Sequence, residues 1–383
     1  MRSGKARVQL LDLAVSDFRN FDRLELSPSP RATVAVGPNG QGKTNLLEAI
    51  YFLTTLKPLR AAKLAELIRF GVSTAEVSGR FRLKGAIRQI SVRVTEGSRQ
   101  ALVDGKKAQT LEDYFGGVSV VSFTPEDLNV VKGSPDERRK FLDRAVFNRF
   151  PSFLKDSRDY QRALRSRNKL LKEVAPRSYL AVYDQTVAAL GARIWKQRVA
   201  FLAEISSRAA RAFKSIACIE APLTCRYQPT HLSGDVKDTA EEELKRELLT
   251  ALQLRTGRDL ERGFTSVGPH ADDLELSLGD RSARSYASQG QQRALVLAWK
   301  IAEIENLHQA HGFLPLLLLD DVSSELDPER NAYLMSYLAK TGAQVFLTTT
   351  DATLVAPAAG FDAVWYEVQA GAIKPLISHP RPA

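Results

Sequence analysis

The residues Gly37-Pro38-Asn39-Gly40-Gln41-Gly42-Lys43-Thr44 follow the apolar run Thr33-Val34-Ala35-Val36. Their spacing, G-x-x-x-x-G-K-[ST], is that of a P-loop, so we expect a buried strand, a glycine-rich turn and a helix from about Lys43. In such a turn, backbone N–H groups surround phosphate oxygens and the helix N-terminus adds partial positive charge. We predict that all eight residues bind a nucleoside triphosphate, with Lys43 at its β- and γ-phosphates and Thr44 on Mg²⁺.

A second apolar run, residues 316–319, ends in the carboxylates Asp320 and Asp321. Four consecutive leucines are too apolar for a strand with one solvent face and are typical of a central parallel strand. We expect Asp320 to lie beside Thr44 and to bind Mg²⁺ directly or through water, and Asp321 to polarise the attacking water. Lys43, Asp320 and Asp321 are therefore the candidate catalytic residues. The alternative is a strand that merely ends in two turn-forming aspartates.

A third candidate nucleotide site is the helix start Ser288-Gln289-Gly290-Gln291-Gln292. Ser288 suits the N-cap position, whereas Gly290 in the first turn lowers helix stability without a packing benefit. A glycine there is explained if a ligand approaches the backbone closely, and an exposed helix N-terminus favours a phosphate. Simple helix capping is the alternative.

The length of the chain predicts about two domains, and its charge is concentrated in one basic segment. The 383 residues are 44% apolar and 26% charged, with a net charge of +10. Residues 132–172 hold thirteen Lys/Arg against five Asp/Glu, so they carry most of that excess, which favours a polyanionic partner. The two cysteines match neither a zinc nor a redox spacing. No apolar run reaches the ~20 residues of a membrane span and residues 1–17 do not resemble a signal peptide, so we expect a cytoplasmic protein.

Hydrophobic periodicity divides the chain into strand-rich and helical parts. Strand patterns occupy residues 7–26, 75–103 and 118–123, and they return at 273–278 and from 316 onward. Helical patterns fill residues 136–149, 151–173, 179–215 and 239–256, with a mixed interval, residues 216–235, that has room for a strand pair. We therefore expect one α/β domain from residues 1–135 plus 257–383, and a helical lobe, residues 136–256, inserted into it. The insertion explains why the P-loop and Asp320 lie so far apart in the sequence.

These motifs together resemble an ABC-type ATPase head, and they resemble the RecF family of bacterial recombination proteins more closely still. The most specific parts are residues 125–143, with Pro125-Glu126, Gly133-Ser134-Pro135 and Arg138-Arg139, and residues 318–327. Residues 37–48 and 288–293 match the family position by position as well. The resemblance covers nearly the whole chain. It implies an α/β fold, namely an ABC-type P-loop ATPase head with a mixed sheet, flanking helices and an inserted, mainly helical second lobe.

The resemblance also implies a composite site. In such heads, residues 288–292 contact the γ-phosphate of ATP held by another subunit, so two chains close around two nucleotides. The segment 324–327 resembles a loop that crosses this dimer interface, which adds Asp327 to the nucleotide-binding residues. Arg19 and Asn20 match a nucleotide-side motif after the first strand. Such a protein binds duplex or gapped DNA and, with RecO and RecR, promotes RecA loading in recombinational repair, replication and the SOS response.

Several positions depart from the pattern. Asp321 stands where SMC-type heads have glutamate, although aspartate is usual in the RecF family, and its shorter reach predicts slow ATP turnover. Ala271 in the segment Gly268-Pro269-His270-Ala271-Asp272-Asp273 replaces an expected arginine, so the role of that loop is open. Residues 54–60 lack the usual glycine and serine but keep Arg60. Residues 348–350 are threonines where transporter ATPases carry a switch histidine.

The basic segment supplies the candidate DNA contacts. Arg158, Arg162 and Arg165 are spaced i, i+4 and i+7 and share one helix face. We predict contacts to DNA phosphates, with little base specificity, from Arg138, Arg139, Lys140, Arg158, Arg162, Arg165, Arg167 and Lys169. Arg138 and Arg139 lie inside the family motif, so they are also candidates for attaching the inserted lobe. A solvated, salt-bridged helix face is the alternative for any one of these residues.

We interpret the chain as an ATP-dependent DNA-binding protein that dimerises on ATP and hydrolyses it weakly. One alternative is a binding module in which nucleotide acts as a switch without productive hydrolysis. Another is the ATPase subunit of an ABC transporter, which the threonines at 348–350 and the inserted basic lobe argue against.

Overall fold

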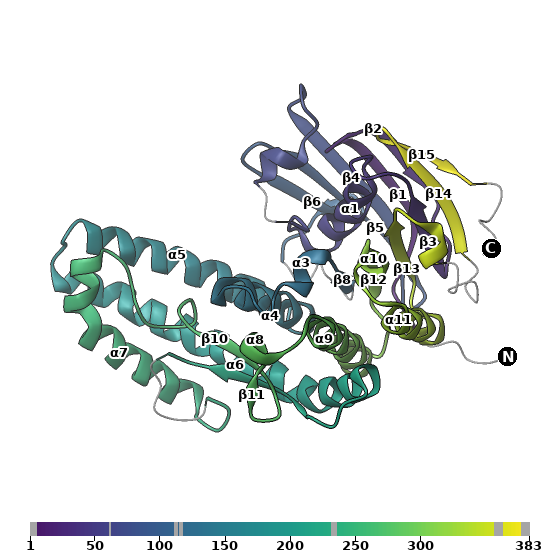
Figure 1. Ribbon diagram of the computed structural model, residues 1–383. Helices are drawn as coiled ribbons and strands as arrows, with labels where there is room; N and C mark the ends of the chain where they lie inside the picture. Colours follow the sequence, from purple (N-terminus) through teal and green to yellow (C-terminus); the bar gives the residue numbers. More distant parts are fainter. Residues whose placement is uncertain are drawn as a thin grey trace. The chain divides into compact units, whose positions relative to one another are not determined.

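The structure, a computed structural model shown in Figure 1, describes residues 6–60, 63–110, 114, 118–230, 236–355 and 363–376. The chain forms two compact units. Unit 1 contains residues 1–128 and 303–383, and unit 2 contains residues 129–302.

A mixed sheet of six strands forms the centre of unit 1, in the order β15-β14-β3-β13-β12-β8. All neighbours are parallel except β14 and β15, which form an antiparallel hairpin at one edge. These strands are β3 (Ala32–Val36), β8 (Val120–Phe123), β12 (Leu316–Asp320), β13 (Val345–Thr349), β14 (Ala363–Gln369) and β15 (Ala372–Pro375). Because β13 pairs with both β3 and β12, its carboxyl end lies between the carboxyl ends of those two strands.

An antiparallel sheet completes the strands of unit 1, in the order β2-β1-β4-β5-β6-β7. Its members are β1 (Gln9–Phe18), β2 (Phe21–Leu26), β4 (Thr74–Leu83), β5 (Ala86–Thr95), β6 (Arg99–Val103) and β7 (Lys106–Lys107). Helix α1 (Lys43–Thr55) contacts strands of both sheets. Most of α1 is buried for that reason, and its amino end is held at the carboxyl edge of the mixed sheet.

The other elements of unit 1 that the structure describes are helical. They are η1 (Leu64–Leu67), α3 (Pro125–Leu128), α10 (Val322–Glu325), α11 (Pro328–Thr341) and η2 (Ala352–Leu354). Helix α9 (Gln289–His311) begins in unit 2 and ends in unit 1. The strand patterns expected from residue 316 onward end in the antiparallel pair β14 and β15.

Unit 2 is mainly helical, and Figure 1 shows α5, α6 and α7 running side by side. Its helices are α4 (Pro135–Arg149), α5 (Phe153–Lys172), α6 (Arg177–Ala217), α7 (Glu241–Arg262) and α8 (Ala283–Tyr286). A three-stranded sheet joins them, in the order β11-β10-β9, from β9 (Leu223–Gln228), β10 (Asp273–Leu278) and β11 (Arg281–Ser282). The α/β class, the P-loop head and the helical lobe predicted from the sequence are therefore confirmed.

The division into units differs from the expected boundaries at residues 135 and 256. Strand β10 pairs with β9 along its whole length and contacts α4, so residues after 256 stay with the helical part. The strand pair considered for residues 216–235 is also different. Only β9 forms there within the described residues, and its partner is β10; Ser233 and Gly234 lie outside those residues.

Candidate functional site: a P-loop pocket

The P-loop has the predicted strand-turn-helix form. Strand β3 ends at Val36, and α1 begins at Lys43 with Gly42 as its N-cap. The Gly42 φ of 116° lies in a region that side-chain-bearing residues rarely adopt, and a Cβ there would lie 2.6 Å from the Asn20 amide nitrogen. Glycine at this position therefore lets the turn fold tightly against Asn20.

Lys43 folds back over the turn that precedes it. Its Nζ donates hydrogen bonds to the carbonyl oxygens of Gly37 and Pro38, at 2.7 and 2.9 Å. Burial lowers the pKa of Lys43 from its ordinary value, while the nearby Asp321 and Asp320 oppose that change. The ammonium is thus held at the P-loop beside two carboxylates, where a phosphate would meet it.

Asp320 Oδ1 accepts two hydroxyl hydrogen bonds. One comes from Thr44 at the start of α1 and the other from Thr348 on β13, both at 2.8 Å. Burial raises the pKa of Asp320, and these two hydrogen bonds oppose the rise because they favour the ionised form. The pairing of Thr44 with Asp320 expected from the sequence is present, although the two residues lie 276 positions apart.

Asp321 is held in an unusual backbone conformation. Its φ is 49°, in the left-handed region that is uncommon for a residue with a side chain. Its backbone N–H donates to the Thr348 carbonyl at 3.1 Å and to the Thr348 hydroxyl at 3.0 Å. Within the described residues its Oδ1 is buried without a hydrogen-bond partner. A buried carboxylate oxygen without a donor suits a water molecule or a cation at this position.

These groups share a pocket of about 350 Å³. The pocket is lined by the P-loop with the start of α1, by the carboxyl end of β12, and by two further segments around residues 60 and 125. The lining residues are Asn39, Gly40, Gly42, Lys43, Thr44, Asn45, Arg60, Pro125, Glu126, Asp320 and Asp321. A hydroxyl, two carboxylates and an ammonium at one glycine-rich turn fit Mg²⁺ and a triphosphate by donor type.

Four pocket-lining residues were not predicted from the sequence: Asn45, Arg60, Pro125 and Glu126. Arg60 Nη2 donates to Asn45 Oδ1 at 3.2 Å, which joins the segment after α1 to the helix itself. Glu126 is the exposed second residue of α3. Arg60 and Glu126 both lie within family-like segments, but nothing in their spacing indicates that they reach the P-loop.

Arg19 and Asn20 occupy different positions around the loop. Arg19 forms a two-pronged pair with the fully buried Glu48 of α1, at 2.8 and 3.2 Å, and is not among the pocket-lining residues. Asn20 contacts the P-loop itself, because its Nδ2 donates to the Gln41 carbonyl at 3.0 Å and its Oδ1 accepts from Asn45 at 2.7 Å. A direct nucleotide contact by either residue stays a prediction.

The turn between β14 and β15 supports the P-loop from the other side. The Ala370 N–H donates to Gln41 Oε1 at 2.8 Å, and the Gly371 N–H donates to the Gln41 carbonyl at 3.0 Å. Gly371 has a φ of 76°, and a Cβ there would collide with the Asn20 carbonyl oxygen. The β14–β15 turn thus holds Gln41 by both its side chain and its backbone, and so helps to fix the conformation of the P-loop.

The segment 288–292 begins α9 in unit 2 and forms a capping box. The Ser288 hydroxyl accepts from the Gln291 N–H at 3.2 Å, and the Gln291 side chain accepts from the Ser288 N–H at 2.9 Å. Ser288 and Gln289 are exposed, whereas Gln292 is buried and donates to the Ala287 carbonyl. In unit 1, Asp327 caps α11 by accepting from the Arg330 N–H at 3.1 Å. Their roles toward nucleotide stay predictions.

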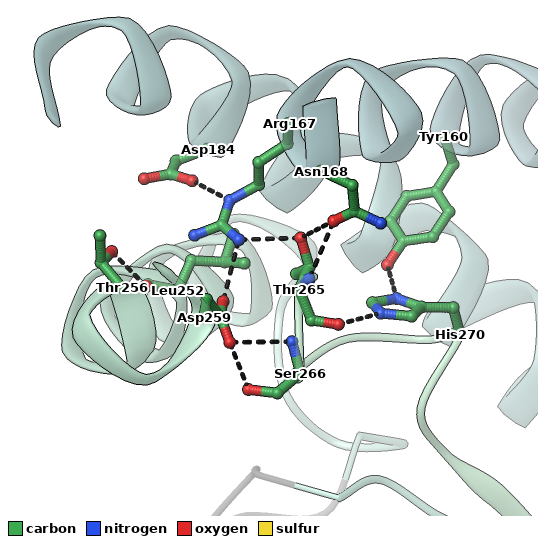
Figure 2. A network of polar contacts seen from close by, with 10 residues as sticks. All are labelled: Tyr160, Arg167, Asn168, Asp184, Leu252, Thr256, Asp259, Thr265, Ser266 and His270. Carbon is green, nitrogen blue, oxygen red and sulfur yellow. Dashed lines mark hydrogen bonds and ion pairs between the residues drawn. The ribbon is translucent and has the colours of Figure 1, made fainter. Parts of the chain in front are cut away.

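Two of the predicted DNA contacts are wrong because the side chains are buried. Arg167 on α5 is fully buried and pairs with Asp184 at 2.6 Å and Asp259 at 2.9 Å, as Figure 2 shows. Arg138 on α4 forms a two-pronged pair with Asp273 at 2.7 Å. The Arg167 side chain is fully shielded from solvent and that of Arg138 is only 5% exposed, so both guanidinium groups are committed to their carboxylate partners and not to a DNA phosphate; Arg138 joins α4 to β10.

Arg139 is half-buried and donates to the Asp272 carbonyl at 2.6 Å. The remaining predicted contacts are exposed: Lys140 on α4 and Arg158, Arg162, Arg165 and Lys169 on α5. Lys155 and Lys172, which were not predicted, are also exposed and continue the same spacing of three and four residues along α5. We call Lys155, Arg158, Arg162, Arg165, Lys169 and Lys172 the α5 cationic stripe.

The loop 268–273, whose role was open, is a packing centre of unit 2. His270 contacts Tyr160 at 2.7 Å and the Thr265 carbonyl at 2.9 Å (Figure 2). Asp272 accepts from Trp195 at 2.5 Å and from Tyr227 at 2.7 Å. These bonds fasten the start of β10 to α5, α6 and β9, whereas nothing in the structure explains the alanine at 271.

The region of the chain that the structure describes contains no helix with the length and apolar character needed to span a membrane.

Comparisons with known proteins agree with this geometry. Residues 9–372 match the family described as RecF/RecN/SMC N terminal domain. DNA replication and repair protein RecF of Myxococcus xanthus is 62% identical over 368 residues, covering 96% of this chain and 97% of that protein. The RecF-ATP structure of the recombination mediator protein of the RecFOR pathway has a TM-score of 0.87 at 29% identity, covering 98% of this chain and 100% of that chain. An Smc head domain of Pyrococcus furiosus, at 16% identity and a TM-score of 0.53 over 96% of both chains, shares the fold.

Proposed function

Because the chain belongs to the RecF family, we propose that it is an ATP-binding protein of DNA replication and repair whose ATP-driven dimer binds DNA and hydrolyses ATP slowly. The observation that carries this proposal is the 2.8 Å hydrogen bond between Thr44 and Asp320, because it joins the P-loop to a metal-binding carboxylate. The relatives' name and the RecF-ATP structure support the same assignment.

ATP and Mg²⁺ are the proposed ligands of the pocket. Thr44 and Asp320 would hold Mg²⁺, and Lys43 with the N–H groups of the turn would hold the phosphates. When bound, Mg²⁺ neutralises charge on the phosphate oxygens. Asp321, whose Oδ1 is buried and has no hydrogen-bond partner among the described residues, would orient and polarise the attacking water. Its short side chain is our reason for expecting slow turnover.

Dimerisation would complete each site. Ser288 is exposed at the start of α9, and its capping box presents a helix N-terminus that suits the γ-phosphate of a nucleotide on a second copy. Asp327 would lie at the same dimer interface. In this proposal each nucleotide would lie between the P-loop of one copy and the start of α9 of the other, so ATP binding would favour the homodimer.

DNA would bind through the α5 cationic stripe, with affinity supplied by phosphate contacts and little base readout. Three of the six cations have an acidic neighbour at the long end of the ion-pair range: Asp159 lies 3.8 Å from both Arg158 and Arg162, and Glu173 lies 3.8 Å from Lys169. From the family we further propose a cytoplasmic protein that acts with RecO and RecR to load RecA in recombination and the SOS response.

Two alternatives lead to different measurements. A nucleotide-switched module without hydrolysis would show no steady-state ATP turnover with or without DNA. A transporter ATPase would copurify with a membrane subunit, and the threonines at 348–350, where transporter ATPases carry a switch histidine, disfavour it.

The composite site is tested by sedimentation velocity of the full chain with ATP and a gapped duplex. Wild type should dimerise with ATP, whereas Lys43→Met should stay monomeric because it lacks the phosphate contact. Ser288→Arg should bind ATP but fail to dimerise, because only the second half of the site is blocked. A wild-type protein that remains monomeric under all these conditions would overturn the mechanism.

A further inference from the structure

Three arginines gather in unit 1 at the amino end of the parallel strands. Arg7 precedes β1, Arg31 immediately precedes β3, and Arg82 lies on β4 opposite Gln9 of β1. The P-loop follows the other end of β3, whose five residues span about 16 Å. The cluster is therefore separate from the nucleotide pocket.

The three guanidinium groups bond only to neutral acceptors among the described residues. Arg7 donates to the Gly342 carbonyl and Arg31 to the Ala339 carbonyl, both at 2.8 Å, at the end of α11. Arg82 donates to Gln9 Oε1 at 3.2 Å. Two other arginines on the antiparallel sheet that contains Arg82 do have acidic partners: Arg80 pairs with Asp12, and Arg93 pairs with Glu76.

The positive charges lie close enough to repel one another. A Cβ added at Gly342 would lie 3.5 Å from Arg31, and Arg7 donates to that same residue. Burial lowers the pKa of Arg7, and the charges of Arg31 and Arg82 lower it further. The cluster is thus a place where positive charge is concentrated without a carboxylate partner in the described part of the chain.

Helix capping accounts for only part of this arrangement. The C-terminus of α11 carries about half a negative charge, whereas the three arginines carry three positive charges. Arg82 does not bond to the helix at all. Each guanidinium has five N–H donors, and a single oxygen atom accepts from each in the contacts above. Both charge and donor capacity therefore remain available to an anion.

We propose that Arg7, Arg31 and Arg82 form a phosphate-binding site that is distinct from the P-loop. A phosphate group presents several oxygens in a tetrahedral arrangement and can accept from guanidinium groups that approach from three chain segments, whereas a carboxylate has two oxygens in one plane. The phosphate belongs either to a nucleic-acid backbone or to a free phosphate compound.

The test compares full-length wild type with Arg82→Gln, because Arg82 is exposed and does not cap α11, and with Arg7→Gln. Arg93→Gln is the matched control, since Arg93 lies on the same sheet but is paired with Glu76. For a free phosphate, the Tm of each protein is measured in chloride and then in inorganic phosphate at equal ionic strength. The rise in Tm caused by phosphate should be smaller in Arg82→Gln and Arg7→Gln than in wild type and Arg93→Gln. Phosphate at the P-loop affects all four proteins equally, so the difference reports the cluster.

For a nucleic-acid phosphate, duplex DNA is titrated over a range of salt concentrations. Each cluster variant should lower the slope of log K against log[salt] by about 0.9, which corresponds to one lost phosphate contact. Either a reduced phosphate response or a reduced slope supports the site and identifies the source. If the cluster variants match wild type with both phosphate probes, the proposed site is overturned. Polyglutamate is the third probe: if the variants lose binding to it while both phosphate results are unchanged, the cluster binds an acidic protein segment instead.

Discussion

Thr348 donates its hydroxyl hydrogen bond to Asp320 Oδ1 at 2.8 Å. The same hydroxyl oxygen accepts the backbone N–H of Asp321 at 3.0 Å, so one buried side chain contacts both acidic residues of the pocket. Asp321 keeps its left-handed backbone conformation while making this bond. Thr348 is therefore a positioning residue, because it acts on the site through Asp320 and Asp321.

Thr348→Val keeps the shape of the side chain and removes only the hydroxyl. We expect ATP turnover to fall about 10- to 100-fold, as for other residues that orient metal ligands. The Kd for ATP should change much less, because the P-loop N–H groups are untouched. Single-turnover hydrolysis and equilibrium titration of labelled ATP separate the two effects.

Thr348→Ser should restore turnover, since it returns the hydroxyl. Thr349→Val is the matched control, because Thr349 is buried on the same strand but bonds to the backbone of Asp351. Wild-type turnover in Thr348→Val would show that the hydroxyl does not position the carboxylates.

Gly371→Ala should weaken ATP binding from a distant part of the sequence. The alanine Cβ would collide with the Asn20 carbonyl, and the φ of 76° would strain any side-chain-bearing residue by about 1–2 kcal/mol. Displacing this turn would remove its two hydrogen bonds to Gln41, so we expect the Kd for ATP to rise roughly tenfold, which corresponds to about 1.4 kcal/mol. Isothermal titration with ATP measures it.

Gly105→Ala is the control for backbone strain alone. Gly105 has a nearly equal φ of 75°, and a Cβ there would meet nothing within 4 Å. It should lower stability through the backbone strain alone and leave the affinity for ATP unchanged. Equal losses of affinity in both variants would mean that the contact with Gln41 is unimportant.

The P-loop and the Asp320 strand were predictable because each is a local pattern: an apolar run followed by residues with fixed chemistry. The role of Thr348 was not predictable from spacing, because it depends on β13 lying between β3 and β12. The position of Arg60 and Glu126 in the pocket likewise requires the three-dimensional arrangement. Strand order, which is set by long-range pairing, is the information that the motifs lack.

The mistaken assignment of Arg167 has a different cause. Charge density alone predicted it to be exposed, yet it falls in phase with Tyr160, Leu164 and Leu171, the buried face of α5. The helical period therefore contained the signal that separates Arg167 from Arg165. The boundary expected at residue 256 failed because the pairing of β10 with β9 is non-local.

Arg167→Ala should destabilise unit 2 strongly. It would leave the buried carboxylates of Asp184 and Asp259 without their cation, a loss that typically costs 3–5 kcal/mol. Arg165→Ala, two residues away on the exposed face, should change the free energy of unfolding by less than about 0.5 kcal/mol. Urea denaturation followed by circular dichroism compares them, and equal stability of the two variants would contradict the buried pairing.

Asp320 should make stability depend on pH in an identifiable direction. Because burial raises its folded-state pKa above the unfolded value of about 3.9, the folded protein retains the proton longer than the unfolded chain. The contribution of Asp320 to stability therefore falls as pH rises from the unfolded pKa through the folded pKa, and is constant above it.

Asp320→Asn removes this titration. Without nucleotide, the difference in unfolding free energy between Asp320→Asn and wild type should grow across that pH window, with the variant gaining relative stability. Urea titrations at successive pH values measure the difference. A difference that shrinks as pH rises would mean that the folded state favours the ionised carboxylate.

The α5 cationic stripe should control the salt dependence of DNA binding. Changing Arg158, Arg162 and Arg165 together to glutamine removes three exposed charges from one helix face, so the slope of log K against log[salt] should fall by about 2.7. The same triple change at Arg23, Arg88 and Arg93, which pair with carboxylates on the strand-rich unit, alters net charge equally and should leave the slope almost unchanged. Fluorescence anisotropy with duplex DNA supplies the slopes. Because both variants lose three charges, a difference between them reports the location of the DNA contact and excludes a general effect of net charge; equal slopes would place the DNA away from α5.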